Sequence, residues 1–126
     1  FEDDRGEFIA LRRFRGQRIL LNFWQSWSKP CLKELRRLQE LHDQAGRDAP
    51  FIVALCGDRE PTALAGVRRE NNLSFSLVHD RLQQTARYFK VRCWPSTVSI
   101  NPEGIIDRIQ FGLTHEPGEE SACRQA

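Results

Sequence analysis

The segment RILLNFW, residues 18–24, is a continuous apolar run of strand length. A strand that is apolar on both faces is typical of the centre of a sheet covered on both sides. Pro30 then opens a stretch in which leucine recurs at every third position, and this spacing predicts an amphipathic helix of about three turns. These leucines are Leu32, Leu35, Leu38 and Leu41. A buried strand followed directly by such a helix favours an α/β fold.

The remaining pattern continues this alternation. The polar residues of the first helix are expected to face away from the core, and they are Lys33, Glu34, Arg36, Arg37 and Glu40. Asp80 is predicted to cap a later helix that carries Leu82, Ala86 and Phe89 on its apolar side. The other predicted elements are strands at 49–56, 75–78, 97–100 and 105–111, a helix from Ala63 to about Asn72, and a hairpin turn at 101–104.

Together these elements predict an α/β fold with a central mixed β-sheet flanked by helices, because parallel neighbours require crossover connections. With 126 residues, of which 40% are hydrophobic, the chain is expected to form a single domain over residues 1–126. From about residue 113 the sequence becomes a polar tail.

Composition excludes several function classes. A formal net charge of +2 is too small to indicate a nucleic-acid partner. The four cysteines are too scattered for a zinc site, so neither a metal nor another cofactor is expected. No apolar run is long enough to span a membrane. Because the sequence starts at Phe1, a trimmed or mature chain is expected, which leaves a membrane tether outside it possible.

The stretch WSKPC, residues 27–31, lies between the first strand and its helix. In open α/β sheets, sites form at the carboxyl ends of the strands. This topology alone makes WSKPC the first candidate for a functional site.

The segment RGQRILLNFWQSWSKPCLKEL resembles a region that carries W-C-x-x-C at a helix start, and YFKVRCWPSTVSINPEGIIDRI resembles a cis-proline segment with a hairpin after it. Through these two segments the chain resembles the thioredoxin fold, and in particular the periplasmic thiol-disulfide oxidoreductases of cytochrome-maturation type within the redoxin and alkyl hydroperoxide reductase superfamily. The resemblance implies a periplasmic or extracytoplasmic location. It also implies a protein or peptide thiol or disulfide as substrate.

Carried over by position, Ser28 stands in place of the attacking cysteine, Cys31 is the resolving cysteine, and Pro95 is the cis-proline. Asn22 replaces the buried carboxylate of some thioredoxins. Expected substrate contacts are Trp27, Lys29, Pro30 and Trp94, although packing is the simpler interpretation of Trp27.

The serine decides which chemistry is left. A hydroxyl forms no disulfide, so Ser28 and Cys31 cannot carry out the disulfide exchange that two cysteines of a C-x-x-C motif perform. Cys31 is then the candidate redox thiol, and Lys29 together with the helix dipole is expected to lower its pKa. Cys93 is a possible resolving partner, with a packed, unreactive thiol as the simpler alternative.

Three functions remain open. The first is a thiol-disulfide oxidoreductase with an altered S-x-x-C site. The second is a redox-inactive thioredoxin-fold module that binds a peptide or protein. The third is a one-thiol peroxidase, because peroxiredoxins carry T-x-x-C, although the proline that they place seven residues before the cysteine is here Trp24. Reactivity of Cys31 separates the first function from the second, since a buried thiol of ordinary pKa favours binding.

Overall fold

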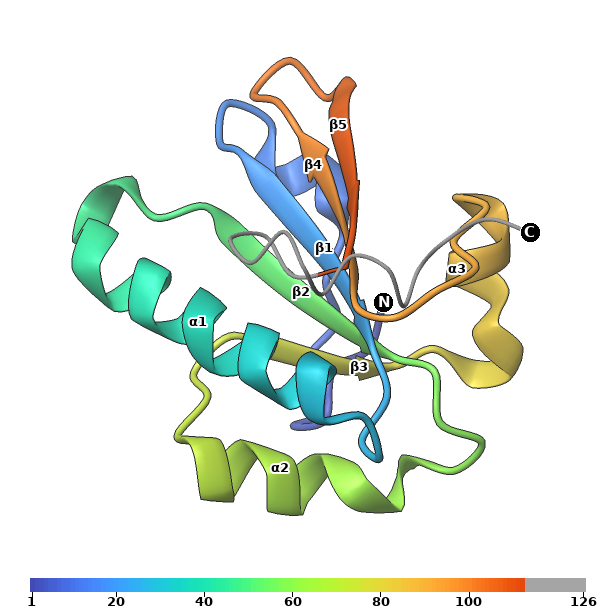
Figure 1. The fold of residues 1–126 in the computed structure, drawn as a ribbon. Helices are drawn as coiled ribbons and strands as arrows, with labels where there is room; N and C mark the ends of the chain where they lie inside the picture. Colours follow the sequence, from blue (N-terminus) through green and yellow to red (C-terminus); the bar gives the residue numbers. More distant parts are fainter. Residues whose placement is uncertain (113–126) are drawn as a thin grey trace.

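The computed structural model describes residues 1–112, which form a mixed five-stranded sheet in the order β3-β2-β1-β4-β5 (Figure 1). The central strand β1 (Ile19–Trp24) pairs in parallel with β2 (Phe51–Cys56), which pairs in parallel with β3 (Ser76–His79). On its other side β1 pairs antiparallel with β4 (Ser96–Ile100), and β4 continues into the antiparallel strand β5 (Ile106–Phe111). The predicted fold class, an α/β thioredoxin-like fold with a mixed sheet, is confirmed.

Three α-helices connect the strands, two of them between the parallel strands and the third between β3 and β4. They are α1 (Lys29–Ala45), α2 (Leu64–Asn71) and the short α3 (Gln84–Tyr88). Four 3₁₀ turns complete the described chain, and these are η1 (Leu11–Phe14), η2 (Gly46–Asp48), η3 (Pro61–Ala63) and η4 (Arg81–Gln83). None of the helices in this part of the chain is long and apolar enough to cross a membrane.

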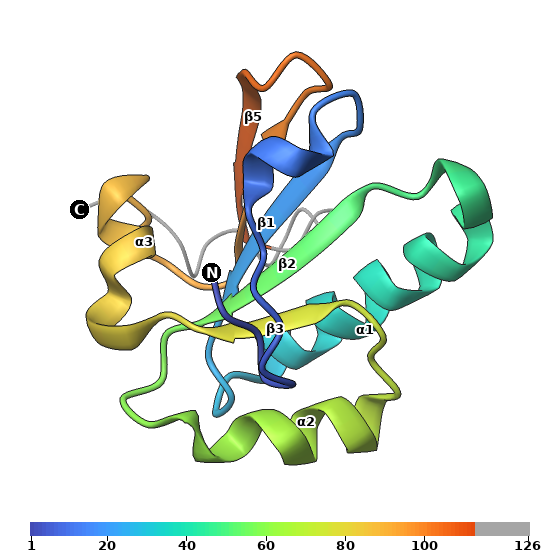
Figure 2. The ribbon, with the colours of Figure 1, turned by 180° about the vertical axis from the view of Figure 1, so that it is seen from behind.

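The sheet has a separate hydrophobic core on each face. On one face α1 and α2 pack over β1 and β2, and the residues they bury there include Leu35, Leu38, Leu64 and Val67. On the opposite face α3 and η1 cover an aliphatic and aromatic cluster around Leu21 and Phe23 (Figures 1 and 2). Apart from Asn22, strand β1 carries apolar residues on both faces because it contributes to both cores.

Helix α1 is longer than predicted, and one of its charged residues lies inside. Ser28 caps its first turn, and its last turn ends at Gly46, whose positive φ of 57° turns the chain and whose N–H donates to the carbonyl of His42. Glu34, predicted on the solvent face, is 0% exposed. It follows Cys31 by three positions and precedes Leu38 by four, so helical geometry sets it on the buried face.

Leu82 was predicted to lie on the apolar side of a helix. This prediction is wrong, because Leu82 is 64% exposed. Leu82 and Gln83 have φ values of 56° and 54°, so the chain turns through the left-handed region before α3 begins. Asp80 supports this turn, since its carboxylate accepts the backbone N–H groups of Thr85 at 2.8 Å and Ala86 at 3.0 Å. The predicted capping role of Asp80 is therefore confirmed, although the helix starts later.

At the other end of the sheet, the hairpin between β4 and β5 follows its prediction. The side chain of Asn101 accepts the backbone N–H groups of Glu103 at 3.1 Å and Ile105 at 3.0 Å, and Gly104 takes a φ of 88°. The predicted polar tail from about residue 113 lies outside the described residues. A single domain over residues 1–126 stays a prediction.

Candidate active site

Cys31 lies in the first turn of α1, where the chain returns from the end of β1. The backbone N–H of Cys31 donates to Ser28 Oγ at 3.3 Å, and the N–H of Leu32 donates to the carbonyl of Ser28 at 3.1 Å. Ser28 is therefore a helix cap, as its residue type allows. The Cys31 side chain is 0% exposed and packs among the residues under α1.

A second loop lies against the WSKPC loop. The N–H of Gly57 donates to the carbonyl of Trp24 at 2.8 Å. Asp58 then accepts the backbone N–H of Ser26 at 3.0 Å and also binds the Ser26 hydroxyl. The segment after β2 thus holds the segment after β1, so the two loops form one unit at the carboxyl ends of the parallel strands.

The environment of Cys31 raises the pKa of its thiol. Burial is the largest cause, and the negative charges of Asp58 and Glu34 act in the same direction. The hydroxyl of Ser28 and the backbone N–H of Gln25 oppose the shift, because both stabilise the thiolate. The predicted lowering of the Cys31 pKa by Lys29 and the helix dipole is wrong, since desolvation at a buried position outweighs the helix terminus.

Cys56 is a second free thiol beside this site. It is the last residue of β2, is 0% exposed, and pairs in register with Trp24 at the end of β1. Burial raises its pKa to about 12, and the negative charges of Asp58 and Cys31 contribute to this shift. The predicted buried strand 49–56 includes Cys56, but sequence reasoning missed that the fold brings this residue to the site.

Asp58 and Glu34 also belong to the site although the motif does not contain them. A signal for Asp58 exists in the sequence, because it comes two residues after a buried strand at the functional edge of the sheet. The signal for Glu34 is its helical spacing from Cys31.

The second predicted segment contributes Trp94 and Pro95. The Trp94–Pro95 peptide bond is cis. Trp94 packs against both hydrophobic cores, and a Cβ at Gly57 would lie 3.3 Å from its Nε1. Trp94 therefore lies over the backbone that follows Cys56.

Asn22, at the position of the buried carboxylate in some thioredoxins, is 0% exposed. Its Nδ2 donates to Thr97 Oγ1 at 3.1 Å, which ties β1 to β4. The side-chain amide of asparagine does not ionise, so Asn22 cannot transfer a proton as a carboxylate would. Its role here is structural.

Cys93 precedes this segment. It is disulfide-bonded, whereas Cys31 and Cys56 are free thiols. The structure thus does not join Cys31 to Cys93, and a bond between them would require exchange of the existing disulfide. The pairing of Cys31 with Cys93 stays a prediction.

A cleft of about 600 Å³ opens beside the WSKPC loop. Trp27 lies on its wall and is 75% exposed, so the interpretation of Trp27 as a packing residue is wrong. Lys29 is exposed and Pro30 is half-buried on the same loop. The cleft is lined by Gln25, Trp27, Gly57, Asp58, Arg59, Glu60, Thr62, Leu82, Gln83 and Arg87.

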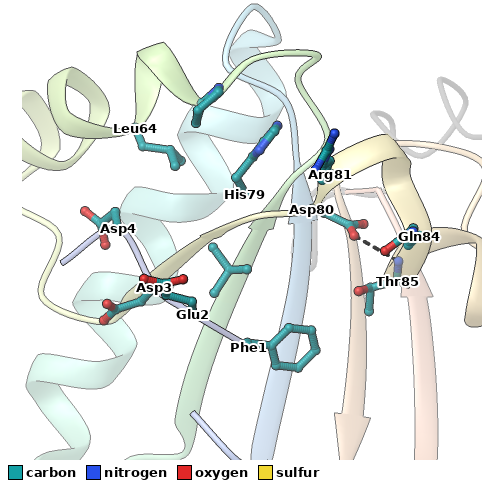
Figure 3. A pocket seen from close by; sticks show the side chains of 12 residues that line it. Phe1, Glu2, Asp3, Asp4, Leu64, His79, Asp80, Arg81, Gln84 and Thr85 are labelled. Atoms are coloured by element: carbon teal, nitrogen blue, oxygen red, sulfur yellow. Dashed lines mark hydrogen bonds between the residues drawn. The ribbon is translucent and has the colours of Figure 1, made fainter. Parts of the chain in front are cut away.

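A second cleft, of about 540 Å³, lies along β3, and neither free thiol is among the residues that line it (Figure 3). The N-terminal segment forms one wall, where Asp4 makes a paired contact with Arg68 at 2.6 and 2.7 Å. Although Asp3, Asp4 and Asp80 all line this cleft, no group of three or more metal-binding side chains occurs within residues 1–112.

Comparison with known proteins agrees with this geometry. The chain matches the AhpC/TSA family over residues 1–109. It is 30% identical over 119 residues to thiol-disulfide oxidoreductase ResA of Bacillus thuringiensis subsp. konkukian, covering 94% of this chain and 69% of that protein.

Solved structures give the same result. StoA from Bacillus subtilis superposes with a TM-score of 0.76 at 25% identity, covering 90% of this chain and 86% of that one. A putative thiol:disulfide interchange protein DsbE from Chlorobium tepidum shares the fold with a TM-score of 0.82 at 21% identity, covering 95% and 83%. The chain thus belongs to the AhpC/TSA family, as a thioredoxin-fold, redoxin-type relative of the thiol-disulfide oxidoreductases.

Proposed function

We propose that this protein is a thiol-disulfide oxidoreductase with an altered S-x-x-C site, in which Cys31 is the redox thiol and a protein or peptide disulfide is the substrate. The observation that carries the proposal is the arrangement at the start of α1. There, Ser28 Oγ accepts the backbone N–H of Cys31 at 3.3 Å, and the Ser28 hydroxyl and the Gln25 N–H both act to lower the Cys31 pKa against the effect of burial.

The first chemical step follows from this arrangement. The Cys31 thiolate attacks one sulfur of a substrate disulfide, forms a mixed disulfide and releases the other sulfur as a thiolate, which takes up a proton. The Cys31 backbone N–H already donates to Ser28 Oγ, so the Ser28 O–H is available to donate to the sulfur. Ser28 therefore stabilises the attacking thiolate but cannot resolve the mixed disulfide.

The substrate would lie along the exposed side of the same loops. Trp27 offers a large apolar surface beside the 600 Å³ cleft, and Lys29 and Pro30 follow Trp27 on the same loop. Trp94 and Pro95, in the cis-proline segment, would face the substrate from the opposite side. An extended substrate peptide would pair with the backbone of this segment as an added strand does.

Burial of Cys31 sets the rate of this chemistry. A thiol with 0% exposure and a raised pKa carries little thiolate at neutral pH, so reaction requires the WSKPC loop to open. The same observation favours a second candidate function, a redox-inactive module that binds a peptide or protein without exchange. It disfavours a one-thiol peroxidase, which depends on an activated thiolate.

An oxidising, periplasmic or extracytoplasmic compartment fits the proposal. The disulfide at Cys93 supports this location, because disulfides persist outside the reducing cytosol. A solved relative at 19% identity is described as a secreted disulfide oxidoreductase of Mycobacterium tuberculosis, and it shares the fold.

The test measures how fast Cys31 forms a mixed disulfide with 2-hydroxyethyl disulfide between pH 6 and 10, with Cys31→Ser as the control. Because the pKa of Cys31 is raised, the rate should still climb at pH values where a free thiol, with a pKa of about 8.5, levels off. A Cys31 that stays unmodified in the native protein up to pH 10 would overturn the oxidoreductase proposal and favour the binding module.

Ser28→Cys is the matched gain-of-function variant. It restores two thiols at the positions of a C-x-x-C motif, so disulfide reduction should rise by about tenfold or more over the parent chain. The comparison is made by reduction of insulin with dithiothreitol as the electron donor. An unchanged rate would indicate that more than the missing thiol disables the site.

A further inference from the structure

We propose that Cys31 and Cys56 form a non-adjacent redox pair, in which Cys56 is the resolving thiol that Ser28 cannot be. This inference rests on the proposed function and extends it to the second half of the reaction.

The backbone brings the two residues to one place. Cys56 ends β2 directly beside Trp24, and the next residue, Gly57, is hydrogen-bonded to the Trp24 carbonyl at 2.8 Å. The chain that leaves Trp24 reaches Cys31 within one short loop, and Asp58 holds that loop through the backbone N–H of Ser26 at 3.0 Å. The loop that leads to Cys31 is therefore anchored to the two residues that follow Cys56.

The two cysteines belong to the same buried cluster. Both are 0% exposed, and both belong to the cluster that α1 and α2 cover, together with Trp24. Neither thiol is used elsewhere, since both are free. Cys56 on a strand and Cys31 on the helix that covers it thus share one core.

Electrostatics supports the same proximity. The negative charge on Cys31 raises the pKa of Cys56, and the charge of Asp58 raises the pKa of both thiols. Oxidation removes both buried thiols as ionisable groups at once.

The proposed reaction balances without a further oxidant. Cys31 attacks the substrate disulfide R–S–S–R, giving Cys31–S–S–R and one R–SH. Cys56 then attacks the Cys31 sulfur, which forms the Cys31–Cys56 disulfide and breaks the bond to R, releasing the second R–SH. The substrate is reduced by two electrons, the protein dithiol is oxidised, and the two thiol protons end on the two R–SH products.

The test treats the full chain with 2-hydroxyethyl disulfide at pH 9 and maps cysteine-containing peptides by mass spectrometry without reduction. The expected product joins the Cys31 and Cys56 peptides, with the loss of two hydrogen atoms. In a Cys56→Ala variant the mixed disulfide at Cys31 should persist about tenfold longer than in the parent chain or more. Circular dichroism checks that this variant is folded, and the peptide map of the unmodified chain does not depend on it.

Two failures are distinguishable. If the mixed disulfide at Cys31 forms but lasts equally long in the parent chain and in Cys56→Ala, or if Cys31 links to Cys93, the pair is wrong while the proposed function stands. If no mixed disulfide forms on Cys31 in either protein, the proposed function itself fails, and the pair with it.

Discussion

The two faces of the sheet differ in what they bury. The core under α1 and α2 holds both free thiols, Cys31 and Cys56, and α1 also buries the carboxyl group of Glu34. The core under α3 and η1 consists, among the described residues, of aliphatic and aromatic side chains around Leu21 and Phe23. The two cores lie on opposite faces of the same strands, but only one of them contains free thiols. Stability and thiol reactivity are therefore expected to respond to different substitutions.

The largest effect is expected on the apolar face. Leu21 is 0% exposed, and Leu21→Ala should lower the free energy of unfolding by about 2–5 kcal/mol, because it removes buried surface and leaves a cavity. Urea denaturation measures this loss. The rate of Cys31 modification in native buffer should stay close to that of the parent chain, and a large change in that rate would break the separation between the faces.

A smaller loss is expected at the turn before α3. Asp80→Ala removes the carboxylate that accepts two backbone N–H groups, at 2.8 and 3.0 Å, which costs about 1–2 kcal/mol of stability. Thermal unfolding is the measurement, and Asp80→Asn is the control that keeps one acceptor. Equal melting temperatures for Asp80→Ala and the parent chain would show that the turn does not depend on this cap.

The opposite behaviour is expected at Ser28, on the thiol face. Ser28→Ala should cost only about 1 kcal/mol of stability, because it removes one helix-cap acceptor. It should also raise the pKa of Cys31 further, since the hydroxyl is one of the groups that lower it. The pH profile of Cys31 alkylation measures this shift. A profile that moves to lower pH would contradict the assigned role of the hydroxyl.

The smallest effect is expected at Asp4, which links the N-terminal segment to α2. Burial raises the pKa of Asp4, but the hydrogen bonds and charge of Arg68 outweigh it, so the pKa in the folded state is below its usual value. The stabilisation is therefore present above the unfolded-state pKa of about 3.9 and is lost as pH falls through the lower folded value.

Asp4→Asn should accordingly destabilise the protein by at most about 1 kcal/mol at neutral pH. The difference from the parent chain should shrink toward pH 2. Denaturation curves at pH 7 and pH 3 test the sign, and a difference that grows on acidification would contradict it.

The sequence predicted the architecture because its periodicities are strong. Each pattern indicates one type of element. The apolar run of β1 indicates a buried strand, the leucine spacing of α1 indicates an amphipathic helix, and the residues 101–104 indicate a hairpin turn. WSKPC was found for the same reason, since it lies where a strand gives way to a helix.

The electrostatics of the site was not predictable in the same way. The raised pKa of Cys31 depends first on burial, which comes from tertiary packing and outweighs the lowering effect of its chain neighbours Ser28 and Gln25. The proximity of Cys56 likewise depends on the parallel register of β1 and β2, which sequence spacing does not encode. Leu82 was misplaced because two consecutive left-handed residues interrupt an otherwise helical pattern.

Two of the three tryptophans give the molecule optical probes at distinct depths. Trp24 is 0% exposed and lies in the core that contains both free thiols, whereas Trp27 is 75% exposed on the loop. Disulfides quench nearby indole emission, so the blue-shifted emission of Trp24 would report the redox state of the pair. The red-shifted emission of Trp27, which iodide can reach, would report the arrival of a partner at the cleft. Oxidation and docking are thereby readable in one spectrum of the unlabelled protein.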